Sequence, residues 1–157
     1  MYSFMNDYSE GAHPRVLELL GKSNYQQNTG YGQDIHSEKS KEYIRKLIGN
    51  ESVDIHYIPG GTLTNLIVIS ALLRPHQCVI SADTGHINVH ETGAIEATGH
   101  KVVAVPSVEG KLTPEAIQAA LDYHSDEHMV QPKMVYISNS TELGTIYSKA
   151  ELTRIHN

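Results

Sequence analysis

Tyr57-Ile58-Pro59-Gly60-Gly61-Thr62-Leu63-Thr64-Asn65-Leu66 is the stretch that decides the fold. It ends a run of β-branched and aromatic residues that starts at Val53, and it begins a run of good helix formers, so it predicts a strand end, a glycine turn and a helix start. Thr62 is of a residue type that can cap such a helix. A helix N-terminus directs unpaired N–H groups and the positive end of the helix dipole at one point. The stretch therefore predicts a site for an anion such as phosphate.

Two other interpretations of this stretch were weighed. Gly60 and Gly61 could simply turn the chain, and Thr62 could simply cap the helix. A nucleotide site of the familiar kinds is not supported, because no Lys-Ser or Lys-Thr pair follows the glycines and the sequence has no G-x-G-x-x-G. We expect a phosphate group but not a nucleotide.

The composition limits the class of protein. With 157 residues, 39% of them hydrophobic, the chain can bury a core of one domain or one large lobe. The formal net charge of −6 and the absence of any Lys or Arg run argue against nucleic acid and anionic membranes as partners. Met1 to Gly11 lacks the pattern of a signal peptide, and no apolar stretch is long enough to span a bilayer. We expect a cytoplasmic protein in which the single Cys78 is buried in a strand.

Beyond residue 50, short apolar runs alternate with amphipathic segments. This alternation predicts an α/β fold, three-layered (α/β/α), with a mainly parallel sheet. The expected strands are Val53–Ile58, Cys78–Ser81, Lys101–Val105 and Lys133–Ile137, and the expected helices between them are Thr62–Leu73, Asn88–Thr98 and Pro114–Tyr123.

The chain divides into two parts in this interpretation. Residues 1–50 form an N-terminal arm with helices at Pro14–Leu20 and Asp34–Ile48, and residues 51–157 form the first part of a larger domain. Ser148 to Asn157 resembles a helix that begins with a cap but has no glycine or proline to end it. We therefore expect the sequence to be a truncated piece of a longer protein.

In open parallel sheets, ligands bind beyond the carboxyl ends of the strands. Four loops follow the expected strands, and we expect them to share one site. They are Pro59–Asn65, Ala82–Glu91, Pro106–Gly110 and Ser138–Thr145.

The second of these loops carries His86. If a helix begins near Asn88, His86 lies at its mouth, where an imidazole can stack on a flat ring or take up a proton near neutral pH. The alternative is an ordinary hydrogen-bonded loop histidine. A zinc site was also weighed, since His90 lies four residues after His86 and Glu91 adjoins it. The spacing matches no complete zinc motif and would need a third ligand from His56, His100 or His124, so no metal is expected.

Taken together, these loops resemble the threonine aldolase and β-eliminating lyase group of pyridoxal-phosphate enzymes, whose large domain has the fold type I, PLP-dependent transferase-like architecture. Five segments carry the resemblance along nearly the whole chain, and their order and spacing make it specific. They are Asn6-Asp7-Tyr8-Ser9-Glu10-Gly11, Tyr31-Gly32-Gln33-Asp34, Gly60-Gly61-Thr62-Leu63-Thr64-Asn65, His86-Ile87 with Glu91-Thr92-Gly93-Ala94, and Ile137-Ser138-Asn139-Ser140-Thr141.

The resemblance implies roles for individual residues. The cofactor would be pyridoxal 5'-phosphate, with its phosphate held at Gly60, Gly61 and Thr62. His86 would stack on the pyridine ring and act as the base for the substrate hydroxyl. The substrate-binding residues implied are Asn6, Tyr31 and Glu91, although Asn6 stands where many relatives have serine.

The implied reaction is aldol cleavage of a β-hydroxy-α-amino acid, threonine or allo-threonine, to glycine and acetaldehyde. Alternatives are a β-eliminating lyase, an aminotransferase, or a non-catalytic fragment that keeps only the phosphate pocket. The family's cofactor-binding lysine and pyridine-pairing aspartate find no counterpart in this sequence, so we expect these 157 residues to be inactive alone. The resemblance also implies a homodimer or homotetramer, with the loop Ser23–Gly32 reaching a neighbouring subunit.

Overall fold

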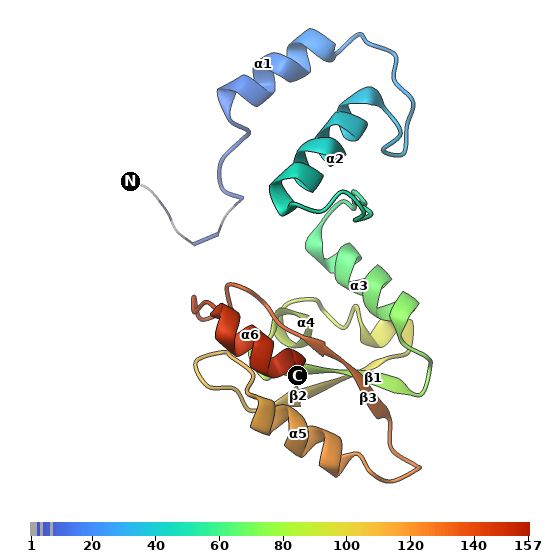
Figure 1. Cartoon of the computed structure of the whole chain (residues 1–157), viewed down its shortest axis with the longest axis vertical. Coiled ribbons are helices and arrows are strands. Elements are labelled where there is room, and N and C mark those ends of the chain that lie inside the picture. Colours follow the sequence, from blue (N-terminus) through green and yellow to red (C-terminus); the bar gives the residue numbers. More distant parts are fainter. Residues whose placement is uncertain (1–2, 4, 7) are drawn as a thin grey trace. The chain divides into compact units, whose positions relative to one another are not determined.

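The computed structural model describes residues 3, 5, 6 and 8–157, so Asp7 of the first resembling segment lies outside the described residues. The chain forms two compact units, Met1–Tyr57 and Ile58–Asn157 (Figure 1). In the described part of the chain, no helix has both the length and the apolar character needed to cross a bilayer.

Two helices make up the regular structure of the first unit, α1 (Pro14–Ser23) and α2 (Ile35–Ile48). Both were predicted, and their ends follow local rules: Pro14 occupies the first turn of α1, and Gly49 closes α2 at a φ of 72°. Asp34 caps α2 by accepting the backbone N–H groups of His36 and Ser37, each at 2.9 Å. Hydrogen bonds from the Ser37 hydroxyl and then from its backbone N–H lower the pKa of Asp34 to about 2.

The predicted strand Val53–Ile58 is wrong, because this segment is irregular. A β-strand forms only where its backbone N–H and C=O groups pair with a neighbouring strand. No such pairing exists among the described residues, and the carbonyl of Val53 instead accepts a hydrogen bond from Arg45 Nε at 3.2 Å. The β-branched residues of the segment favour a strand, but no partner strand for it exists among the described residues.

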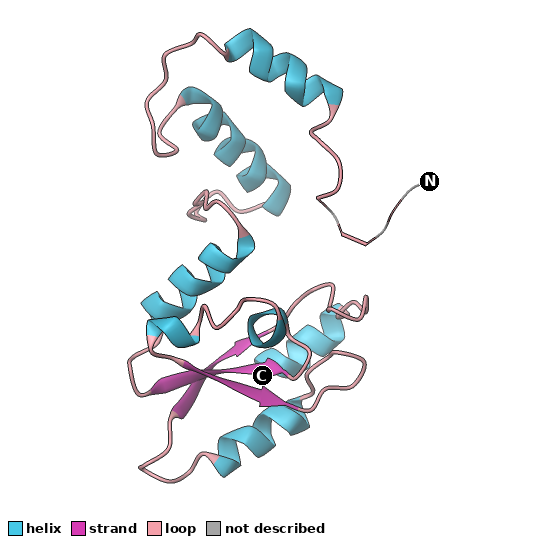
Figure 2. Ribbon diagram, turned by 180° about the vertical axis from the view of Figure 1, so that it is seen from behind, coloured by secondary structure: helices cyan, strands magenta, loops and turns pink. Residues whose placement is uncertain are grey.

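The second unit is built on a three-stranded sheet with the order β2-β1-β3. Its strands are β1 (Gln77–Ala82), β2 (Lys101–Val105) and β3 (Gln131–Tyr136), and β1 runs parallel to both neighbours (Figure 2). The prediction of a parallel sheet is confirmed. Cys78 lies in β1 and is fully buried, as predicted, and burial raises the pKa of its thiol.

Helices cover both faces of this sheet. On one face Val79 of β1 packs in a cluster with Ile69 of α3 (Gly61–Leu72) and Ile87 of α4 (His86–Val89). On the other face Ile80 packs with Ile117 of α5 (Pro114–Tyr123), and α6 (Lys149–His156) joins the same cluster. Because consecutive residues of a strand point to opposite faces, β1 supplies the centre of both clusters. The predicted three-layer α/β/α arrangement is confirmed in this unit.

The predicted helix Asn88–Thr98 is wrong in extent. The helix α4 ends at Val89, and a separate 3₁₀ helix, η1, spans Glu96–Thr98. Between them Thr92 and Gly93 have φ angles of 54° and 74°, which a right-handed helix does not allow. His86 is the first residue of the short helix α4. It does not lie just before a longer helix that starts near Asn88, as the sequence analysis supposed.

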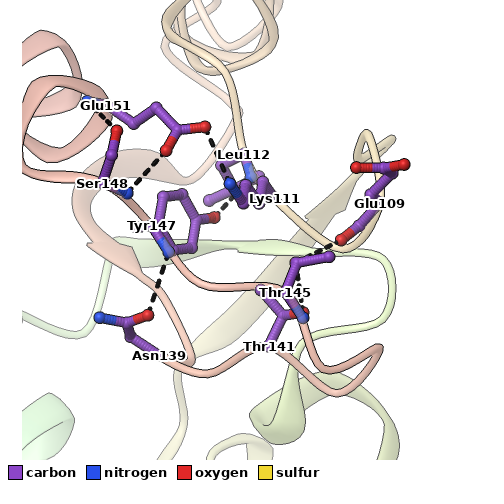
Figure 3. Close-up of polar contacts among 9 residues, drawn as sticks. All are labelled: Glu109, Lys111, Leu112, Asn139, Thr141, Thr145, Tyr147, Ser148 and Glu151. Atoms are coloured by element: carbon purple, nitrogen blue, oxygen red, sulfur yellow. Dashed lines mark hydrogen bonds and ion pairs between the residues drawn. The ribbon is translucent and has the colours of Figure 1, made fainter.

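The loops that follow β2 and β3 are bonded to each other (Figure 3). The phenol oxygen of Tyr147 accepts the backbone N–H of Leu112 at 2.6 Å, and the hydroxyl of Thr145 donates to the carbonyl of Glu109 at 2.7 Å. The hydroxyls of Thr145 and Thr141 also lie 2.8 Å apart. Tyr147 is buried, which raises its pKa. The two loops therefore form one fixed surface at the carboxyl end of the sheet.

A capping box begins α6 directly after these loops. The backbone N–H of Ser148 donates to Glu151 Oε2 at 2.6 Å, and the backbone N–H of Glu151 donates to the Ser148 hydroxyl at 3.2 Å. Lys111 Nζ lies 2.9 Å from the other carboxylate oxygen of Glu151 (Figure 3). Hydrogen bonds from Ser148, and then from Lys111, lower the pKa of Glu151 to about 2.

This capping box predicts how stability depends on pH. A carboxyl group whose pKa is lowered by folding stabilises the folded state above its ordinary value of 4.5, and this contribution is lost as the pH falls toward about 2. Glu151→Gln should therefore lower the free energy of unfolding near neutral pH, and the difference from wild type should shrink between these two values. Chemical denaturation across this range measures it. Glu127→Gln, in an exposed loop, is the control. A difference in free energy of unfolding between Glu151→Gln and wild type that stays constant as the pH falls from 4.5 to about 2 would contradict the prediction.

Candidate active site

The loops at the carboxyl end of the sheet lie together, as the sequence predicted. The hydroxyl of Ser107, after β2, donates to Asp83 Oδ1, after β1, at 2.6 Å. His90 Nε2, in the loop after β1, lies 3.7 Å from Glu142 Oε2 in the loop after β3. Contacts between side chains thus join three of the four predicted loops, and the remaining one, at the start of α3, is joined through Glu91.

The helix α3 begins with unpaired backbone donors. Gly60 is its N-cap residue at a φ of 98°, and no side chain caps the helix. The first helical N–H with an acceptor is that of Thr64, which bonds to the carbonyl of Gly60 at 3.2 Å. The N–H groups of Gly61, Thr62 and Leu63 therefore have no acceptor among the described residues. A Cβ added at Gly60 or Gly61 would meet no atom within 4 Å, so there is open space beside these two glycines.

The prediction that Thr62 caps α3 is wrong. Thr62 is the second residue of the helix, and the N-cap position belongs to Gly60, whose positive φ suits glycine. Thr62 is exposed, and no partner of its hydroxyl exists in the described part of the chain. A hydroxyl in this position is available to an incoming ligand, next to the unpaired N–H groups.

A buried carboxylate lies at the centre of the site. The side chain of Glu91 is 0% exposed. Its Oε1 accepts a hydrogen bond from Asn65 Nδ2 at 2.6 Å and lies 2.8 Å from His86 Nδ1. An ionised carboxylate only accepts hydrogen bonds, so the proton between the two groups belongs to His86 Nδ1. The second carboxylate oxygen of Glu91, Oε2, has no partner among the described residues.

His86 is held at one nitrogen and open at the other. Its neighbour Ile87 is 2% exposed and packs in the core, which fixes the start of α4 against the sheet. The imidazole itself remains 39% exposed. With Nδ1 bonded to Glu91, the neutral ring carries its lone pair on Nε2, where it can accept a proton. This is the arrangement of a general base oriented by a carboxylate.

Asn65 links the two ends of this site. It lies three residues after Thr62 on α3, so both side chains point to the same side of the helix. The helix that begins with free N–H groups therefore also supplies the amide that binds Glu91. The sequence analysis quoted Asn65 in its motif but gave it no role, since its partner lies 26 residues away and no local pattern indicates such a contact.

Asn6 and Tyr31 belong to the first unit. The Oδ1 of Asn6 accepts the backbone N–H of Tyr8 at 3.2 Å and the hydroxyl of Ser9 at 2.6 Å, which is a local turn. Tyr31 is fully exposed at a φ of 61°. The geometry gathers Gly60, Gly61, Thr62, His86 and Glu91 in the second unit, while the roles of Asn6 and Tyr31 stay predictions.

Among the described residues, His86 and His90 belong to no close group of three potential zinc ligands. The rings of His86 and His90 have centroids 5.5 Å apart. Of the suggested third ligands, His100 Nδ1 bonds to the carbonyl of Gln77 and His124 Nδ1 to that of Ala120. The only close group of three potential ligands in the described residues is the exposed Asp126, Glu127 and His128, which includes neither His86 nor His90.

Comparison with known proteins shows which family this chain is similar to. The family model described as beta-eliminating lyase matches residues 22–157. The chain belongs to the beta-eliminating lyase family. Among curated relatives, the low specificity L-threonine aldolases of a Pseudomonas species and of Pseudomonas aeruginosa are 30% and 29% identical to it over 154 residues. These matches cover 97% of this chain and 44% of each relative.

A solved structure of a threonine aldolase from Leishmania major is more similar. It is 54% identical, superposes with a TM-score of 0.95, and is matched over 99% of this chain and 45% of its own length. The fold predicted by resemblance, the α/β large domain of this family, is confirmed. The chain spans less than half the length of the relatives that it matches.

The residues present fit the cofactor of a beta-eliminating lyase. Enzymes of this family use pyridoxal phosphate. The three unpaired N–H groups at the start of α3, the free hydroxyl of Thr62 and the open space beside Gly60 and Gly61 offer donors for its phosphate. Donors without side-chain competition and room for the ligand are what a phosphate requires.

The buried position of Glu91 predicts an effect on stability. Asn65→Ala removes a donor to a buried carboxylate and should lower the free energy of unfolding by about 1–3 kcal/mol. Asn88→Ala is the matched control, because Asn88 Nδ2 donates to the exposed carbonyl of Asp83 at 2.7 Å, and it should cost about 1 kcal/mol or less. Equilibrium denaturation measures both variants. An equal or larger loss in Asn88→Ala would contradict the importance given to the Asn65–Glu91 bond.

Proposed function

We propose that this chain is part of an enzyme that uses pyridoxal 5'-phosphate to cleave a β-hydroxy-α-amino acid, threonine or allo-threonine, to glycine and acetaldehyde. The observation that carries the proposal is His86, which is bonded at Nδ1 to the buried Glu91 and open at Nε2. It is connected through Asn65 to the helix whose first N–H groups are unpaired. The threonine aldolases among the relatives support aldol cleavage over β-elimination or transamination.

The start of α3 would hold the cofactor. The N–H groups of Gly61, Thr62 and Leu63 and the hydroxyl of Thr62 would bind the phosphate, while Gly60 provides the positive φ that turns the chain toward it. When bound, pyridoxal phosphate supplies the electron sink for the bond that breaks at the substrate Cα.

His86 would act as the base for the β-hydroxyl group. Its Nε2 takes the hydroxyl proton while the C–O bond becomes the C=O bond of acetaldehyde and the Cα–Cβ bond breaks. The positive charge that develops on the imidazole is stabilised by the carboxylate of Glu91 at 2.8 Å. Stacking of the same ring on the cofactor, as the resemblance implies, is compatible with its exposed face.

Glu91 would position His86 and not bind substrate. Its side chain is completely buried, and its bonded oxygen already meets His86 and Asn65. The carboxylate fixes the tautomer of the imidazole and the direction of Nε2, as in other pairs of histidine with a carboxylate. Substrate contacts would come from Asn6 and Tyr31 of the first unit.

Assembly and location follow from the same proposal. A second copy of the chain, in a homodimer or homotetramer, is supported by the oligomeric nature of threonine aldolases in general. We also propose a cytoplasmic location, as the sequence analysis expects.

Turnover of threonine by the complete protein that contains this sequence tests the proposal. With added pyridoxal phosphate, L-threonine or L-allo-threonine should give glycine and acetaldehyde in equal amounts. His86→Ala should lower kcat by about 10²–10⁴-fold, because general base catalysis is lost, and should change cofactor affinity far less. His128→Ala, which removes an exposed histidine from the loop before β3, is the control and should leave kcat unchanged. Unchanged turnover in His86→Ala would refute the assignment of the base.

A further inference from the structure

A second histidine adjoins the proposed base. His90 ends α4, and its backbone N–H donates to the carbonyl of His86 at 2.9 Å. This bond sets the spacing of the two side chains, whose ring centroids are 5.5 Å apart with the planes inclined by 54°. This separation and tilt lie in the range of aromatic rings in contact, so the rings of His86 and His90 are direct neighbours.

A carboxylate from another loop faces His90. Glu142 Oε2 lies 3.7 Å from His90 Nε2, beyond hydrogen-bond length but within the range of an ion pair when His90 carries a proton. In the described part of the chain, the titratable groups that face His90 are His86, on its own helix, and Glu142, from the loop after β3. The side chain of His90 is 58% exposed and that of Glu142 is 26% exposed, so the pair opens to solvent while His86 lies deeper.

The loop that carries Glu142 is fixed. The adjacent Thr141 is buried, and its backbone N–H donates to the carbonyl of Thr145 at 2.8 Å. Thr145 in turn bonds through its hydroxyl to the carbonyl of Glu109 in the loop after β2 (Figure 3). Glu142 is therefore placed beside His90 by an ordered backbone, unlike a long side chain on a free surface.

The proton taken by His86 needs a way out. Nδ1 of His86 is occupied by the buried Glu91, so the proton must leave from Nε2, the nitrogen that received it. Because Cα takes up a proton when glycine forms, the cleavage as a whole releases none. In this scheme solvent supplies the proton for Cα and receives the one that His86 took, so that the imidazole is neutral for the next turnover. The nearest other titratable ring is that of His90, and it is in contact with solvent.

We propose that His90 and Glu142 form the proton exit of this site. The proton passes from His86 Nε2 to His90, the resulting imidazolium releases it to bulk solvent, and solvent supplies the proton that Cα takes up when glycine forms. Both rings end neutral, and no electrons are transferred. The carboxylate of Glu142 stabilises the imidazolium of His90 during this transfer. The inference rests on the proposed function, and His90 acts through His86 without contact to the substrate.

Buffer dependence of turnover tests the relay in the complete protein with pyridoxal phosphate and threonine. His90→Ala should lower kcat by about tenfold, less than the loss of a direct acid–base group, and should leave KM for threonine nearly unchanged. Small imidazole buffers should restore the lost rate in proportion to their concentration, since they can replace the missing proton carrier. His128→Ala removes a comparable exposed partner of a carboxylate, Asp126, and should show neither effect. A His90→Ala rate that is low but independent of buffer would overturn the relay.

Turnover by the wild-type protein separates the two proposals. If the wild-type protein cleaves no threonine, the proposed function fails and the relay fails with it. If the wild-type protein cleaves threonine but His90→Ala keeps the wild-type rate, the relay alone fails.

Discussion

The pairing of β1 with a parallel strand on each side is the constraint on which the second unit depends. Because all three strands run in one direction, the loops after them meet at a single edge of the sheet. The residues of β1 from Cys78 to Ala82 are buried and hold a helix layer on each face. Ser107 bonds to Asp83 between the loops after β2 and β1, and Tyr147 bonds to Leu112 between the loops after β3 and β2. These bonds connect the loops that carry the proposed active-site groups.

On this edge, the buried carboxylate of Glu91 turns separate elements into one site. Removing a charge from water is costly unless donors replace the lost hydration, and Asn65 and His86 both supply hydrogen bonds to its Oε1. Asn65 comes from the helix with the unpaired N–H groups, and His86 comes from the short helix after β1. The proposed anion site at the start of α3 and the proposed base at the start of α4 are thereby connected through Glu91. The exposed pair of His90 and Glu142 extends the same chain of polar groups outward to solvent.

The sequence predicted what local patterns determine. Pro114–Tyr123 and Lys101–Val105 were predicted with the bounds that the structure shows, because capping residues and apolar runs mark their ends. The strand Val53–Ile58 failed because pairing depends on a partner that residue types do not reveal. The helix Asn88–Thr98 failed because the pattern gave no warning of the positive φ at Thr92. His86 and the glycines were predicted as site residues from loop position and resemblance. The contacts of Glu91 with Asn65 and of His90 with Glu142 bring together residues from separate elements, and only the folded backbone shows them.

The proposed function depends on binding of the phosphate of a pyridoxal cofactor at the start of α3. The most direct measurement is the affinity of the complete protein for pyridoxal phosphate and for pyridoxal, followed by the visible absorbance of the bound ligand. The account predicts that pyridoxal phosphate binds at least about tenfold more tightly, a difference of about 1.4 kcal/mol, and that Thr62→Val reduces this preference. Thr64→Val is the matched control, because the hydroxyl of Thr64 already bonds to the carbonyl of Gly60 at 2.9 Å. Equal affinity of the wild-type protein for the two ligands would contradict the account.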